Sequence, residues 1–210
     1  MMLNAAVYHV SHPKHGYFPT YTGMTIDDKT DIFISDRSAN AYLPLYPDVA
    51  VHYRCSDNLF SGMGCLSFKT VLDRIPKDAK YVYIFTEYGN RLDGTVMASH
   101  SETILRELMA DIRRAVPGVT VLNKRGSNVY TAMAVFTFAK ITICSPSTFC
   151  FYPAMARDGL TYFPTGRGHY IATNQEIHPN FHFLRDENLF YNNFTKTTPT
   201  ADVVSTLRSG

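Results

Sequence analysis

Short apolar segments alternate regularly with helical segments between residues 49 and 164, and this alternation constrains the fold more than any other feature. Strands are predicted at residues 49–54, 81–86, 119–122, 141–144 and 162–163. Helices are predicted between them, at about residues 66–74, 101–115, 128–139 and 148–157. Strands that alternate with helices are typical of a parallel sheet with helices on both faces. The sequence therefore predicts an α/β, Rossmann-like domain with strand 49–54 at its centre.

Two of the predicted helices allow a buried face to be proposed. In helix 101–115 the apolar residues at helical spacing are Ile104, Leu105, Leu108 and Ile112. Ser99 or Ser101 is expected to cap this helix and Pro117 with Gly118 to end it. In helix 128–139 the residues expected to point inward are Tyr130, Met133, Ala134 and Phe138.

The pattern divides the chain into three parts: an irregular segment 1–47, the Rossmann-like domain 48–165, and a tail 166–210. A short helix is expected in the tail at residues 201–207. Three histidines and three aspartates of the first segment suggest metal sites, but Pro13 and turn chemistry favour solvated loops. These residues are His9, His12, His15, Asp27, Asp28 and Asp31. We expect no metal site and no cofactor.

Charge and cysteine content limit the classes of partner. The net charge is +2, from 20 basic and 18 acidic residues, so no overall field recruits nucleic acid or anionic membrane. No apolar run approaches the roughly 20 residues that span a bilayer, and residues 1–10 lack the basic leading region of a signal peptide. The four cysteines lack zinc-knuckle spacing. Cys144 and Cys150 are suited to a disulfide in an oxidising compartment, but buried free thiols are favoured. A glycosylation sequon at Asn193 permits a secretory location.

The first polar stretch follows the central strand. His52, Arg54, Ser56 and Asp57 come where strand 49–54 ends. Ligands of open parallel sheets bind beyond the carboxyl ends of the strands, and an arginine there offers a planar charged fork that suits phosphate. Pairing of Arg54 with Asp57 to close a loop is an equally good interpretation of these residues.

The second polar stretch joins strand 141–144 to the next helix. Ser145, Ser147 and Thr148 lie in this turn, and the free amides and dipole of a helix N-terminus favour an anion. An ordinary N-cap is the alternative role for Ser147 or Thr148. Both stretches are expected on one rim of the sheet, which indicates a phosphate or nucleotide-sugar ligand. The chain has no dinucleotide fingerprint, no phosphate loop and no nucleophile elbow.

Together, residues 52–57 and 143–148 resemble the donor-binding half of the GT-B fold fucosyltransferases that use GDP-fucose. These enzymes share a strand that ends in His-x-Arg with an Asp soon after, and a later strand followed by a Ser/Thr-rich turn and a helix. The resemblance covers roughly residues 49–164. The chain is also similar to uncharacterised algal and protist proteins with a Tyr-Arg-Cys-x-Asp core.

The resemblance implies a metal-independent glycosyltransferase that moves a sugar, with fucose favoured, from a GDP-sugar to a glycan or glycoprotein in the Golgi or ER lumen. Arg54 and Asp57 are the implied catalytic residues: Arg54 contacts the β-phosphate, and Asp57 orients Arg54 or touches the sugar. His52 lies against the nucleoside. Ser145, Ser147 and Thr148 complete the donor site. The alternative is a non-enzymatic nucleotide- or carbohydrate-binding module, or an inactive fragment of such an enzyme.

Overall fold

The computed structural model describes residues 43–55, 59, 64–86, 96–124, 127–165, 179–184, 189–190, 194–195 and 197–210. The chain divides into two compact units, Met1–Leu43 and Pro44–Gly210, and the elements below belong to the second. The histidines and aspartates considered for residues 1–42 lie outside the described residues, as do Ser56, Asp57 and Asn193.

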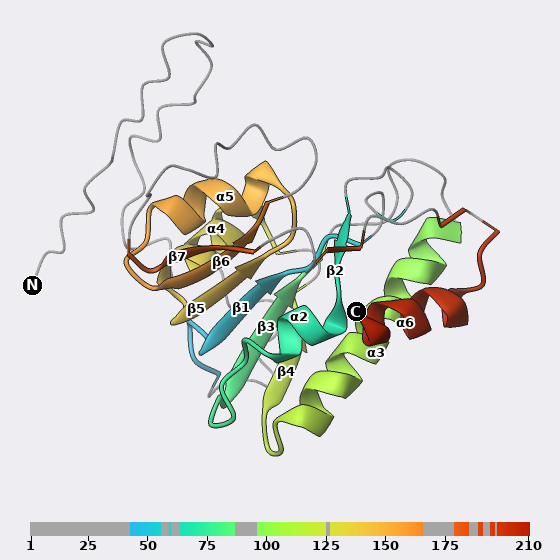
Figure 1. Ribbon diagram of the computed structural model, residues 1–210. Coiled ribbons are helices and arrows are strands. Elements are labelled where there is room, and N and C mark those ends of the chain that lie inside the picture. Colours follow the sequence, from blue (N-terminus) through green and yellow to red (C-terminus); the bar gives the residue numbers. More distant parts are fainter. Residues whose placement is uncertain are drawn as a thin grey trace, which may run out of the picture. The chain divides into compact units, whose positions relative to one another are not determined.

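Six parallel strands of the described residues form the main sheet, in the order β4-β3-β1-β5-β6-β7 (Figure 1). Their bounds are β1 Val49–His52, β3 Tyr81–Phe85, β4 Thr120–Asn123, β5 Ile141–Cys144, β6 Leu160–Pro164 and β7 Phe181–Leu184. Counted along the chain, this order is 3-2-1-4-5-6, the Rossmann arrangement. The predicted α/β parallel sheet is confirmed, and β1 lies in its interior.

Parts of the fold differ from the sequence prediction. Leu66, where a helix was expected to begin, lies instead in strand β2 (Cys65–Leu66), which pairs antiparallel with β8 (Leu189–Phe190). Helix α2 (Phe68–Leu72) begins only after Ser67, whose Oγ accepts the Thr70 N–H at 3.0 Å. The segment after residue 166 adds β7 to the sheet, and its expected helix is α6 (Thr200–Ser209).

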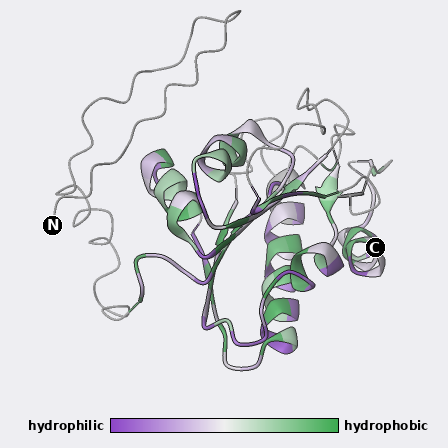
Figure 2. Ribbon diagram, turned by 60° about the vertical axis from the view of Figure 1, so that its left-hand side comes forward, coloured by the Kyte–Doolittle hydropathy of each residue, from purple (hydrophilic) through white to green (hydrophobic). Residues whose placement is uncertain are grey.

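Helices cover both faces of the sheet (Figures 1 and 2). Helices α2, α3 (Val96–Ala115) and α6 pack on one face, and α4 (Val129–Phe138) and α5 (Thr148–Met155) pack on the other. Side chains alternate along β1, so Val49 and Val51 join the first cluster and Ala50 joins the second. No helix of the described residues is long and apolar enough to cross a membrane.

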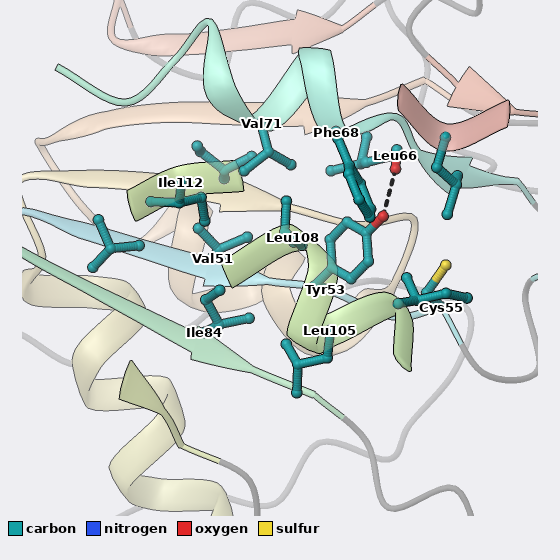
Figure 3. Close-up of a cluster of buried hydrophobic side chains, with 14 of the residues drawn as sticks. Val51, Tyr53, Cys55, Leu66, Phe68, Val71, Ile84, Leu105, Leu108 and Ile112 are labelled. Carbon is teal, nitrogen blue, oxygen red and sulfur yellow. Dashed lines mark hydrogen bonds between the residues drawn. The ribbon is translucent and has the colours of Figure 1, made fainter. Parts of the chain in front are cut away.

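The larger cluster places α2 and α3 against β1 and β3 (Figure 3). Tyr53, just after β1, lies among these side chains and donates its phenol to the carbonyl of Leu66 at 2.8 Å. The predicted buried face of α3 is confirmed, because Ile104, Leu105, Leu108 and Ile112 are at most 3% exposed. However, α3 begins at Val96, so Ser99 and Ser101 lie inside it and are not caps. No Gly or Pro between residues 96 and 101 stops the helix from extending.

The predicted inward face of α4 is wrong for its two aromatic residues. Tyr130 is 48% exposed and Phe138 is 60% exposed, whereas the buried residues are Ala132, Val135 and Phe136. The helix is apolar all round, so the spacing of its apolar residues selects no single face. The Phe138 ring packs instead against Tyr46, with 5.1 Å between ring centroids.

Candidate functional site

The strand order reverses between β1 and β5. From β1 the chain moves outward to β3 and β4, and it then returns to the other side of β1 as β5. In open parallel sheets, ligands bind at this switch point, beyond the carboxyl ends of the two strands. The described residues of the two polar stretches, 52–54 and 145–148, lie at the ends of β1 and β5, so the fold places them at the switch point (Figure 1).

Ser145 joins the two stretches directly. The Arg54 backbone N–H donates to Ser145 Oγ at 2.9 Å, and the Ser145 N–H donates to the carbonyl of His52 at 2.9 Å. Ser145 is fully buried. Its hydroxyl therefore holds the end of β1 to the end of β5 across 91 positions of sequence.

Ser147 and Thr148 begin helix α5. Ser147 is the N-cap, and its Oγ accepts the N–H of Phe149 at 3.2 Å. Ser147 is 3% exposed, whereas Thr148 is exposed. The first turn of a helix leaves its amides without partners inside the helix, so the amide of the exposed Thr148 offers a donor that an anion would use. Ser147 thus has the capping role, and Thr148 presents the hydroxyl.

All four cysteines are paired, as Cys55–Cys65 and Cys144–Cys150. The free-thiol interpretation of Cys144 and Cys150 is therefore wrong. The turn into α5 folds Cys150 back towards the end of β5, which brings the two Cα atoms to 5.7 Å, a usual separation for a disulfide. One bridge starts at the last residue of β5, and the other starts directly after Arg54.

His52, the last residue of β1, lies in an apolar setting. It is 2% exposed, and its ring lies 5.8 Å from Phe136 and 5.6 Å from Phe149, centroid to centroid. Burial, together with the nearby positive charge of Arg54, lowers the pKa of His52 to about 3. The imidazole is therefore neutral at physiological pH. Among the described residues, its Nδ1 has no hydrogen-bond partner.

Arg54 is half-buried, and its charge is felt at His52. The positive charge of Arg54 therefore acts at the switch point. Asp57, the other residue predicted to be catalytic, lies outside the described residues. Its pairing with Arg54 and its role in catalysis both stay predictions.

Metal binding has no support in the described part of the chain. No group of three or more His, Cys, Asp or Glu side chains there is arranged to hold a metal ion. Sequence reasoning did not foresee the Cys55–Cys65 bridge or the role of Ser145 as a tie between strands. The short spacing of each cysteine pair was a usable signal for the bridges, but the tie depends on strand order alone.

Comparison with known proteins gives no match: no family model, no curated protein and no solved structure matches the chain. The resemblance to GDP-fucose-dependent fucosyltransferases therefore stays a prediction that rests on residues 52–57 and 143–148. The arrangement of the described residues establishes a Rossmann-like α/β fold with a polar switch point between β1 and β5.

Proposed function

We propose that the chain binds the pyrophosphate of a nucleotide sugar at the switch point between β1 and β5. We further propose that it transfers the sugar, with fucose from a GDP-sugar favoured, to a glycan or glycoprotein acceptor without a metal ion. The observation that most supports this proposal is the 2.9 Å bond from the Arg54 amide to Ser145 Oγ. This bond supports the proposal because it brings the backbone of Arg54 to the turn that precedes α5.

Charge stabilisation is the mechanism that this site suits best. A departing nucleoside diphosphate gains negative charge, and fixed donors aimed at that charge lower the barrier. The Arg54 guanidinium provides a permanent positive charge and paired donors from the β1 side. The amide of Thr148 and the α5 dipole provide the positive end from the β5 side. These two sources offset the phosphate charge where other enzymes use a metal ion.

A binding module without transfer activity is the second candidate, and His52 favours it. Direct sugar transfer requires a base to take the proton of the acceptor hydroxyl. His52 is the imidazole at this site, and a pKa of about 3 makes it a poor proton acceptor at neutral pH. If Asp57 does not supply the base, the same site holds a nucleotide sugar without reacting it.

A thermal-shift panel of GDP, UDP, CMP and ADP sugars, with EDTA present, tests the proposal. A ligand that binds only the folded state at 100 times its Kd stabilises that state by about 2.7 kcal/mol, so Tm rises. We expect a GDP-sugar to give the largest rise. Sugar release or transfer then separates the enzyme from the module. If no nucleotide sugar raises Tm, the proposal fails, and a rise that requires Mg²⁺ or Mn²⁺ contradicts its metal-independent form.

Arg54→Lys is the informative variant, because lysine keeps the charge but loses the two-pronged fork. Loss of one well-placed transition-state donor costs about 3–4 kcal/mol in comparable sites, so we expect a rate loss of that size with the fold intact. Arg106→Lys on α3 is the matched control, since the Arg106 side chain is 68% exposed. Equal ligand response in both variants would make Arg54 a structural residue.

A further inference from the structure

We infer that the Cys144–Cys150 disulfide is a positioning element of the switch-point site: it holds the amides of the α5 first turn in a geometry that accepts phosphate. This inference rests on the proposed function, and it adds that the affinity of the site depends on this bridge.

The bridge encloses the whole turn. Cys144 is the last residue of β5 and lies in register with His52 of β1, and Cys150 lies in the first turn of α5. Both cysteines are fully buried. Inside the loop, Ser145 is bonded to β1, and Ser147 caps the amide of Phe149. The disulfide closes the remaining side of the turn, so the chain is restrained from the end of the strand to the start of the helix.

Helix α5 needs such a restraint. It spans eight residues, and isolated helices of this length are marginal in water. Its sequence is rich in aromatic residues and includes Pro153, which has no N–H to donate to the carbonyl of Phe149. The aromatic residues and cysteine also have only moderate helix propensity. Since local preferences hold this first turn weakly, its geometry depends on the covalent bridge and the Ser147 cap together with the packing of α5 in the core.

A second observation at the same turn indicates a ligand. His52 is only 2% exposed, and its ring packs against Phe149 of the α5 first turn. Within the described residues, its Nδ1 has no hydrogen-bond partner. Buried polar atoms are almost always paired, so an orphan nitrogen on a ring that packs against the α5 first turn suggests that a ligand bound there supplies its partner.

The test compares the double variant Cys144→Ala/Cys150→Ala with a control that destabilises the chain elsewhere. Val203→Ala removes two buried methyl groups from α6, which packs with α2 and α3 on the opposite face of the sheet. The probes are inorganic pyrophosphate and GDP, titrated calorimetrically under non-reducing conditions. Ordering a loosened turn on binding lowers affinity, so we expect at least about a tenfold loss for the double variant. The control keeps the wild-type Kd.

The outcomes distinguish failure of the disulfide's positioning role from failure of the proposed function. If wild type binds a probe and the Kd of the double variant is within about twofold of the wild-type Kd, the positioning role of the disulfide is overturned and the proposed function stands. A tenfold change in Kd would be a clear effect on this scale. If wild type binds neither probe, the proposed function fails, and the positioning role of the disulfide fails with it. Equal affinity losses in the double variant and in Val203→Ala also overturn the positioning role of the disulfide, because general destabilisation then accounts for both.

Hydrogen exchange of wild type keeps the inference testable if the double variant does not fold. We expect slow exchange for the amide of Phe149, which Ser147 caps, and for the amide of Ser145, which donates to His52, before any ligand is added. Exchange of both amides at the rate of an open loop in the ligand-free protein would show that the turn is not held, and would overturn the inference.

Discussion

Lowering the pH is predicted to destabilise the protein through His52. The folded chain keeps this imidazole neutral, with a pKa of about 3, because the ring is buried and lies near the charge of Arg54. In the unfolded chain the pKa returns to about 6.5. The stabilisation is therefore fully present above pH 6.5 and is lost as the pH falls from 6.5 towards 3. The slope in that window is about 1.4 kcal/mol per pH unit.

Over the range from pH 8 to pH 4.5, this difference in pKa corresponds to about 3 kcal/mol of unfolding free energy. That is a large part of the roughly 5–15 kcal/mol that stabilises a typical domain. Urea denaturation at half-unit pH steps measures the effect. His52→Phe is the control, because it does not titrate and keeps a ring against Phe136 and Phe149. The wild-type curve should fall more steeply than that of the variant by the amount above.

Parallel curves for wild type and His52→Phe would refute this reasoning. They would mean that His52 takes up a proton as easily in the folded chain as in the unfolded one, and so that water reaches its ring. The description of this part of the switch point as dry and apolar would then be wrong. The objection to His52 as an acceptor base would also disappear, because that objection rests on the same lowered pKa.

Four further predictions concern stability, each measured by urea denaturation. Arg157→Met should cost about 3 kcal/mol or more, because this buried guanidinium donates to three backbone carbonyls that would lose their partner. Gly159→Ala should also lower the unfolding free energy, since an added Cβ would collide with that guanidinium. If Gly159→Ala costs as much in the Arg157→Met background as in wild type, this cause is contradicted. Asp48→Ala should cost about 1–3 kcal/mol, because its carboxylate accepts two backbone amides at the start of β3. Phe136→Ala should cost about 3–5 kcal/mol and Phe138→Ser less than about 1 kcal/mol, since Phe136 is fully buried and Phe138 is 60% exposed; similar losses would contradict the assigned face of α4.

The candidate site shows where local sequence information stops. Residues 52–54 and 145–148 were recognised from their chemistry, because polar side chains that follow apolar strands stand out in a chain of this composition. These two segments lie close together only because β5 returns beside β1, and no local pattern specifies that pairing. The burial of His52 between Phe136 and Phe149 depends on the packing of α4 and α5. The pKa of the ring was therefore beyond sequence reasoning.

The sequence by itself determined the fold class, the positions of the main strands and the buried face of α3, because strand length and helical periodicity are local properties of the chain. Only the tertiary structure decided the strand order, the addition of β7 to the sheet, the two disulfides and the orientation of α4. Each of these depends on which surfaces meet in three dimensions. A helix that is apolar all round, or a cysteine beside a turn, acquires its partner only when the sheet brings distant segments together.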